Sequence, residues 1–388
     1  MRGRVTGQSN LFVKIHLEEL VPSDHPIRAI KRMADDALRA MSRTFAAAYS
    51  DEGRPSVPPE RLLKALVLLS LYTIRSERAL CERIRFDMLF RWFLDMTPDE
   101  ECFDHSVFSV NRRRLDELDV THKFKEQIVF AAIDAGLISE DHFSVDGSLL
   151  QSHASLKSLK HIEKIRAEKE AAAKAKSDGD DHTNGGGKPD SNAWVDFKGE
   201  KRRNATHRST TDPQARLYTK GSGQAAFLYH SMHVLMENRH GLGVDIRVDA
   251  ADGKAEHRSA IKLVDRVGRA IGLEVGTLGG DKNYDCGSFL LDLDRRNIEA
   301  HAACKAKKEI EAHDPPSWER WHNQQGQNDE GYKVSQKKRK LAEEIFGWLK
   351  QYGGLRRSRV VGRWKIQQLA DIALTTLNMV RMVKLLAT

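Results

Sequence analysis

The hydrophobic positions of the first third of the chain repeat with helical spacing. Residues 17 to about 137 are predicted to form one helix after another, because no run in them alternates apolar and polar residues at period two. The segment "VPPERLLKALVLLSLYTI" has Pro58 and Pro59 at a helix start and apolar residues on nearly every face, which indicates a buried helix. We therefore predict an all-helical N-terminal domain over residues 1–137.

The pattern changes after this region, where short runs with strand character begin. The sequence predicts a short strand at 143–145 that ends at Asp146, and then a hairpin of "AFLYHSMHVLMEN" and "GLGVDIRVDAADG" around the turn "RHG". An amphipathic helix that stops at Gly272, a strand that ends at Asp281, a helix and a fifth strand, "IEAHAAC", follow. We predict a mixed α/β domain over residues 138–388, with a mixed sheet flanked by helices.

One segment inside this second domain fits neither pattern. "SLKSLKHIEKIRAEKEAAAKAK" predicts an exposed, charged helix. "SDGDDHTNGGGKPDSN" predicts a flexible stretch, because it is rich in Gly, Asp and Asn and has no apolar anchor. The basic run "KRR" at 201–203 follows. We interpret residues 152–208 as a charged, partly disordered insertion within the α/β domain.

The segment "RKLAEEIFGWLK", residues 339–350, predicts a helix with two distinct faces. At about 100° per residue, one set of apolar side chains lies opposite Glu343, namely Leu341, Ile345, Trp348, Leu349 and Tyr352. A second set lies within about 40° of Glu343, namely Gln336, Arg339, Gly347 and Lys350. Glu344 lies off that line, so Glu343 is the candidate functional carboxylate. Arg339 and Lys350 are candidates for holding phosphates; the alternative is that they form salt bridges with Glu343 along the helix.

The net charge changes the picture, because it points to an anionic partner. The 388 residues carry a net charge of +8, and the pI is near 9.2, which is typical of proteins that bind nucleic acid. Basic residues lie on both sides of the last motif and in one helical cluster: Lys337, Lys338, Arg356, Arg357, Arg359 and Arg363, and Arg112, Arg113 and Arg114. We expect them to bind phosphates; the alternative for each group is a solvated surface.

Several classes of protein are not indicated. The longest apolar run is too short to span a bilayer, and no basic segment leads into an apolar stretch near the amino terminus. The four cysteines are scattered and form no CxxC pair, which favours free thiols in a reducing compartment over a zinc site. We expect a cytoplasmic protein without a membrane partner.

Three acidic residues stand in comparable settings: Asp146, Asp281 and Glu343. Side chains at strand ends gather at one edge of an open α/β sheet and can build a common site. Three carboxylates without a cysteine or histidine pair are a ligand set that suits Mg²⁺ or Mn²⁺. Two such ions about 4 Å apart can activate an attacking oxygen and stabilise a leaving one in a phosphoryl displacement. Each acid alone is more typical of a turn or a solvated helix than of a catalytic site, and their order along the chain carries the hypothesis.

The order and setting of these acids resemble the DDE transposases of bacterial insertion sequences, of the insertion-sequence-four/five type. The last-helix signature of that group is Tyr, two residues, Arg, three residues, Glu, six residues, Lys. Arg339, Glu343 and Lys350 satisfy its spacing, whereas Gln336 stands at the tyrosine position. Tyr332, one turn earlier, could substitute only if the helix extends that far. "FSVDGSLLQSHAS", "STTDPQARLYTKG", "HVLMENRHGL" and "GDKNYD" also look like segments of this group.

The resemblance implies an RNase-H-like catalytic fold and a metal-dependent reaction on double-stranded DNA. The protein would bind the terminal inverted repeats of an element, nick its ends with activated water, and let the 3′-hydroxyls attack target DNA. Asp146, Asp281 and Glu343 would hold two Mg²⁺ or Mn²⁺ ions, and a homodimer would bridge two ends in the bacterial nucleoid. Alternatives are a metal-dependent nuclease that does not join strands, a catalytically inactive DNA-binding regulator, and a helical interaction protein with a basic surface.

Overall fold

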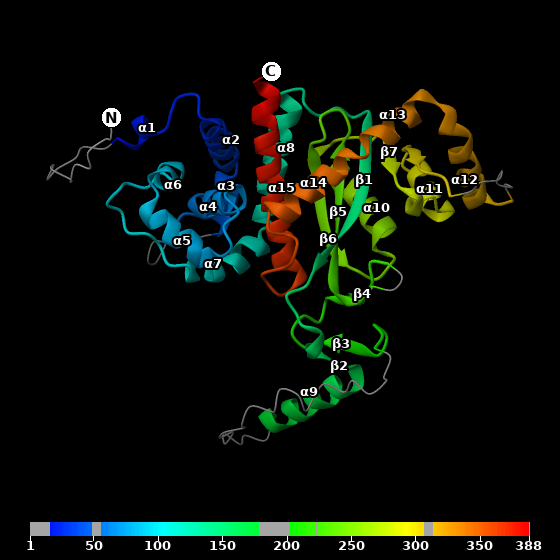
Figure 1. Ribbon diagram of the computed structural model, residues 1–388, viewed down its shortest axis with the longest axis horizontal. Coiled ribbons are helices and arrows are strands. Elements are labelled where there is room, and N and C mark those ends of the chain that lie inside the picture. Colours follow the sequence, from blue (N-terminus) through cyan, green and yellow to red (C-terminus); the bar gives the residue numbers. More distant parts are fainter. Residues whose placement is uncertain (1–15, 49–55, 178–201, 222–223, 306–312, 388) are drawn as a thin grey trace, which may run out of the picture.

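A computed structural model describes residues 16–48, 56–177, 202–221, 224–305 and 313–387 (Figure 1). The N-terminal helices stand on one side of a curled sheet, and helices from the later part of the chain cover its faces and its far edge. The mixed α/β fold class with a helical N-terminal region is confirmed.

The N-terminal region is helical, as its hydrophobic pattern predicts. The helices are α1 (Leu17–Leu20), α2 (Pro26–Ala40), α3 (Ser42–Ala48), α4 (Pro59–Leu71), α5 (Glu77–Phe86), α6 (Met88–Phe93), α7 (Ser106–Glu117) and α8 (Val120–Asp134). Helix α4 starts at Pro59 and is buried along most of its length, since its apolar side chains leave no polar face.

The sheet is mixed, with β1 at its centre. Its strands are β1 (His142–Gln151), β4 (Arg216–Tyr218), β5 (Phe227–Glu237), β6 (Gly243–Ala250), β7 (Thr277–Gly280) and β8 (Glu299–Ala302). The order is β4-β5-β1-β7-β8, and β6 also pairs with β5. Strand β1 runs antiparallel to β5 and parallel to β7, which is parallel to β8. The predicted hairpin and the later strands are confirmed, and the arrangement is consistent with an RNase-H-like sheet.

Strand β1 is longer than the sequence predicts. The expected strand at 143–145 was to end at Asp146, but β1 continues to Gln151 because β5 pairs with it along its whole later half. The parallel pairing with β7 stops at Ser144 opposite Gly279. Asp146 therefore lies inside β1, just beyond the point where its parallel neighbour ends.

Helices pack on both faces of the sheet. Helix α10 (Ala255–Ile271) contacts β5 and β6 and ends at Gly272, whose positive φ of 71° closes the helix as predicted. The other helices are α11 (Gly287–Asp294), α12 (Pro315–Gln325), α13 (Glu330–Lys338), α14 (Leu341–Gln351) and α15 (Arg363–Leu386). Helix α15 packs on β6 and also on α4 and α8, so one core continues from the helical region into the sheet. A domain boundary at residue 137 stays a prediction.

The predicted last helix is interrupted. Helix α13 ends at Lys338 and α14 begins at Leu341, so Arg339 lies in the turn between them. In this turn the amides of Ala342 and Glu343 bond to carbonyls three residues back instead of four, which tightens the backbone. The residues of α14 that are buried are Ala342, Ile345, Phe346 and Leu349. Tyr352, expected on the packed face, is 44% exposed because it follows the end of the helix.

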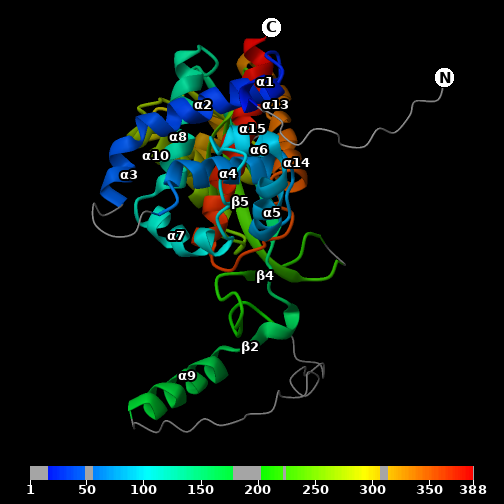
Figure 2. The ribbon, with the colours of Figure 1, turned by 90° about the vertical axis from the view of Figure 1, so that its left-hand side faces the viewer.

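The charged insertion forms an arm that leaves the body of the protein. A short 3₁₀ turn, η1 (Leu156–Ser158), leads into β2 (Leu159–His161), which pairs with β3 (His207–Ser209), and α9 (Ile162–Ser177) extends from this pair (Figure 2). The predicted charged helix is thus present. The stretch predicted to be flexible lies, from residue 178 on, outside the described residues. No helix among the described residues is long and apolar enough to cross a membrane.

Candidate active site

The three candidate acids come from neighbouring elements. Asp146 on β1 accepts a hydrogen bond at Oδ1 from the Gly147 amide, 2.8 Å away. Asp281 follows β7 and caps a short turn, η2 (Lys282–Tyr284), by accepting from the Asn283 amide at 2.8 Å. Glu343 is exposed in the first turn of α14, which packs on β1. The fold thus brings the ends of β7 and α14 to the middle of β1.

The charges of these acids act on one another. Burial is the largest contribution that raises the pKa of Asp146, and the negative charges of Asp281 and Glu343 raise it further. The hydrogen bond from the Gly147 amide and the charge of Arg339 oppose this shift without cancelling it. Both burial and its acidic neighbours therefore disfavour the ionised form of Asp146.

A fourth carboxylate, Glu256, belongs to the same group. It lies in the first turn of α10. Burial raises its pKa most, followed by the charges of Asp281 and Asp146. The sequence did not single it out, because an acidic residue in a first helical turn is ordinary. The order of the elements could have indicated Glu256, because α10 follows the hairpin of β5 and β6 and its N-terminus returns to the sheet near β1. We call Asp146, Asp281, Glu256 and Glu343 the acid cluster.

Tyr284 is a second residue that the sequence reasoning missed. Its side chain is 1% exposed, and its hydroxyl has no hydrogen-bond partner in the part of the chain that the structure describes. Burial, and then the charges of Glu256, Asp146 and Asp281, raise its pKa well above the ordinary value. Gly280 accommodates the ring, since a Cβ on that glycine would lie 2.9 Å from it. The phenol is therefore uncharged and lies beside the acid cluster.

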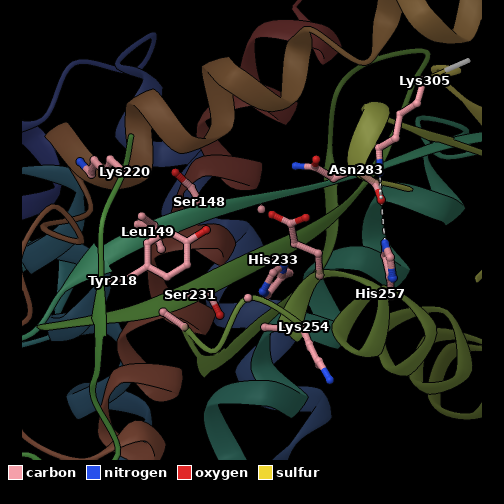
Figure 3. Close-up of a pocket in the computed structure, with 15 residues that line it drawn as sticks. Ser148, Leu149, Tyr218, Lys220, Ser231, His233, Lys254, His257, Asn283 and Lys305 are labelled. Carbon is pink, nitrogen blue, oxygen red and sulfur yellow. Dashed lines mark hydrogen bonds between the residues drawn. The ribbon is translucent and has the colours of Figure 1, made fainter. Parts of the chain in front are cut away.

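A cleft of about 510 Å³ opens beside the acid cluster (Figure 3). Its wall includes Glu256 and Ser148, its rim carries the lysines Lys220, Lys254 and Lys305, and His233 lies at its base. The cleft thus combines acidic and basic groups, as a site for a metal ion beside a phosphate requires.

A basic group lies next to Asp146. The Lys350 ammonium donates a hydrogen bond to Ser148 Oγ on β1. Burial lowers the pKa of Lys350 most, and the positive charges of Lys220 and Arg356 lower it further, while Asp146 raises it. Three cations, Lys350, Lys220 and Arg356, therefore lie close enough to affect one another near Asp146, whose charge offsets their repulsion only in part.

The proposed salt bridges along the last helix are absent. In the described part of the chain, no ion pair joins Glu343 to Arg339 or Lys350, whereas Glu344 pairs with Arg381 at 2.8 Å. The Arg339 Nε donates to Gln336 Oε1 at 3.4 Å. These contacts leave Glu343 without a structural partner and use Glu344 for packing.

Gln336, at the tyrosine position of the signature, joins α13 to the sheet. Its Nε2 donates to the Gly280 carbonyl at 3.2 Å and to the His301 carbonyl, at the ends of β7 and β8. Tyr332 lies within α13, but it is buried and its hydroxyl donates to the Ala302 carbonyl at 3.2 Å. Tyr332 therefore faces β8 and does not replace the missing tyrosine.

The other basic candidates fall into two groups. Some bond to groups of the protein itself: Arg112 is buried and pairs with Glu77, the partly exposed Arg363 pairs with Asp249, and the exposed Arg359 donates to the Ile74 carbonyl. The others lie at the surface or partly so: Lys337, Lys338, Arg113, Arg114, Arg356 and Arg357. The structure thus separates the cations that hold the fold from those with access to a partner.

The acid cluster fits a divalent cation by its chemistry. It supplies only carboxylate oxygens, the donors that Mg²⁺ and Mn²⁺ prefer, and among the described residues no lysine or arginine forms an ion pair with any of its four members. In the same part of the chain, no three acidic, histidine or cysteine side chains are close enough to hold a metal ion as they stand. Binding therefore requires the carboxylates to approach one another.

Two family models match the chain. The transposase domain DUF772 matches residues 15–114, which contain most of the N-terminal helices. The transposase DDE domain matches residues 197–379, from the end of the insertion into α15, and includes Asp281, Glu256 and Glu343. No curated protein and no solved structure matches the chain.

Proposed function

Because the chain belongs to the DDE transposases of insertion sequences, we propose that it binds the terminal inverted repeats of such an element and catalyses cleavage and transfer of DNA strands. The family is of the transposase and nuclease type, uses divalent metal ions and acts on DNA. The remaining steps below, including the residues that carry them, are our proposal for this chain.

In this proposal Asp146, Asp281 and Glu343 hold two divalent cations, Mg²⁺ or Mn²⁺. Such ions activate an attacking oxygen and stabilise the leaving oxygen in a phosphoryl displacement. Asp146 is the most rigid of the three, because it lies inside β1 and is fixed by the Gly147 amide. Glu343 is exposed and follows the turn after α13, so it is the carboxylate that moves to close the site.

The DNA backbone would lie along the basic side of Asp146. Lys350, Lys220 and Arg356 repel one another there, and a phosphate would relieve that repulsion. Arg339 would reach the same backbone from the turn between α13 and α14, which Gln336 ties to the sheet. Exposed Arg113, Arg114, Lys337, Lys338 and Arg357 would extend the DNA contact, and two copies would bridge two element ends.

The observation that carries this proposal is the uncompensated charge around Asp146. A carboxylate whose pKa is raised by burial and by two neighbouring carboxylates, and that forms no ion pair with a cation of the described residues, is costly unless a ligand supplies positive charge. A protein that only binds DNA has no use for such a group.

The test uses the full chain with DNA that carries both presumed element ends, and Mg²⁺ or Mn²⁺. We expect end cleavage and strand joining by the intact protein and by Glu344→Gln, and neither by Asp146→Asn, Asp281→Asn or Glu343→Gln, all of which should still bind DNA. Cleavage without joining would identify a nuclease. Binding without metal-dependent chemistry would identify a regulator and refute the proposal.

A further inference from the structure

Gly147 brings two polar side chains against the strand next to Asp146. A Cβ at this position would lie 2.9 Å from Nδ1 of His233 and 3.6 Å from Cγ of Glu256. Both side chains are therefore within 4 Å of one point on β1. Any larger residue than glycine would displace the imidazole, which belongs to the facing strand β5.

Glu256 is half-buried at this point and forms no ion pair with a lysine or arginine of the described residues. It lines the cleft. The positive end of α10 offsets part of its charge, because Glu256 lies in the first turn of that helix. Burial and the charges of Asp281 and Asp146 raise its pKa, and the charges of His257 and Lys305 oppose that shift without cancelling it.

His233 gives an independent sign that a polar ligand binds here. Its side chain is 1% exposed, lines the base of the cleft (Figure 3), and has no hydrogen-bond partner among the described residues at either ring nitrogen. A buried imidazole with both nitrogens unsatisfied costs free energy that a hydrogen-bonded ligand would recover. It points into the same space as Glu256.

We propose that Glu256 is a fourth carboxylate of the metal site, and that His233 positions it through a water molecule held between the imidazole and the carboxylate. This inference rests on the proposed function, since it assumes that Asp146 and Asp281 hold a divalent cation. It adds a ligand from α10 to a site otherwise built from β1, β7 and α14. Gly147 is the residue that makes room for it.

The first experiment measures the binding of Mn²⁺ alone to the full chain by calorimetry. We expect Glu256→Gln to weaken Mn²⁺ binding by about tenfold or more, and Glu256→Asp to restore part of the affinity. Glu344→Gln is the matched control, because Glu344 pairs with Arg381 away from the cluster, and it should bind Mn²⁺ like the intact protein.

The outcomes separate this inference from the proposed function. If Glu256→Gln binds Mn²⁺ normally and Asp146→Asn does not, the three-acid site stands and Glu256 is not part of it. If Asp146→Asn also binds Mn²⁺ normally, the metal site itself is wrong. A loss of affinity in Glu256→Gln with an unchanged thermal unfolding transition supports the inference, because it excludes misfolding.

His233→Phe tests the positioning role. The ring keeps a similar shape but loses both nitrogens, so replacing unsatisfied polar atoms by apolar ones should leave the thermal transition unchanged or raise it. We expect Mn²⁺ affinity to fall severalfold nonetheless, on the scale of other outer partners of metal sites. A lower transition temperature with unchanged Mn²⁺ affinity would show that His233 is only structural.

Discussion

Two groups of buried charges in the same sheet behave in opposite ways. In the acid cluster, burial and the charges of neighbouring carboxylates raise the pKa of Asp146. In the second group, which we call the ion cluster, Asp245 of β6 forms ion pairs with Lys125 of α8 and Arg266 of α10. Beside them, His122 of α8 pairs with Asp371 of α15. Burial alone would raise the pKa of Asp245, but Lys125, Arg266 and His122 outweigh it and hold the pKa below the ordinary value.

In our proposal, this difference separates charges that stabilise the fold from charges that bind a ligand. The ion cluster joins the N-terminal helices to the sheet, and its acids have partners: Arg266 Nε lies 2.6 Å from Asp245 Oδ2. In the acid cluster, Asp146 is less buried than Asp245 and has no such partner among the described residues. Carboxylates that repel one another lower the stability of the fold, and such a loss of stability is typical of functional sites.

The largest expected effect comes from neutralising the central acid of the ion cluster. Asp245→Asn removes one charge and leaves Lys125 and Arg266 buried without their main counter-charge. Breaking a buried pair in this way costs about 3–5 kcal/mol. Urea unfolding of the purified chain would measure the loss. A change within about 0.5 kcal/mol would show that the ion cluster does not stabilise the fold.

The dependence of the free energy of unfolding on pH gives a second test of the ion cluster. Burial would lower the pKa of His122, but hydrogen bonds with Asp371 and Glu126 raise it to about 9. Lys125 Nζ, 3.0 Å from Nδ1, opposes that shift without cancelling it. A raised pKa stabilises the fold fully below the ordinary value of 6.5, and the gain is lost as pH rises through about 9.

We therefore expect the free energy of unfolding to fall by on the order of 3 kcal/mol between pH 6 and 10 from this group. In the His122→Gln variant the free energy of unfolding should change less between pH 6 and 10, because glutamine does not titrate. If the variant and the intact protein lose stability in parallel over this range, His122 is not the group responsible.

An Asp→Asn substitution in the acid cluster should raise the free energy of unfolding, whereas the one in the ion cluster lowers it. Asp146→Asn removes a repelled carboxylate, so without metal it should raise the free energy of unfolding by on the order of 1 kcal/mol. Because the pKa of Asp146 is raised on folding, its cost is present at neutral pH and is relieved as pH falls toward 3.8.

The effect of Mg²⁺ on thermal unfolding should also distinguish the intact protein from Asp146→Asn. A ligand that binds only the folded state stabilises it by mass action, so Mg²⁺ should raise the thermal transition of the intact protein and leave that of Asp146→Asn unchanged. Equal shifts in both proteins would place the Mg²⁺ site away from Asp146.

The smallest effect is expected at Glu344, beside the candidate acid of α14. Glu344→Gln breaks only a pair with Arg381 in which the glutamate is 62% exposed, and such pairs contribute about 0.5 kcal/mol or less. Differential scanning calorimetry should show almost no change. A loss near that of Asp245→Asn would mean that the α14–α15 contact is far more important than its exposure suggests.

Much of the architecture followed from local pattern. Helical periodicity located the N-terminal helices, and alternation located the hairpin of β5 and β6, because each element buries one face in a single core. The acids at 146, 281 and 343 were found because their order along the chain follows a known signature. That order needs no knowledge of contacts between distant residues.

The errors and omissions have tertiary causes. The end of β1 was misplaced because β5, more than 70 residues away, supplies the partners that extend it. The break at Arg339 depends on hydrogen bonds that the periodicity of side chains does not encode. Glu256 and Tyr284 joined the site only through the packing of α10 and η2 beside β1, and no local motif marks them.

The most direct test measures stability and strand joining on one pair of variants, Asp146→Asn and Asp245→Asn, at a temperature where both are folded. The account predicts that Asp146→Asn is at least as stable as the intact protein and joins no DNA in Mg²⁺, whereas Asp245→Asn is less stable and still joins element ends to target DNA. Strand joining by Asp146→Asn would contradict the account, because the acid cluster would then not be the catalytic site.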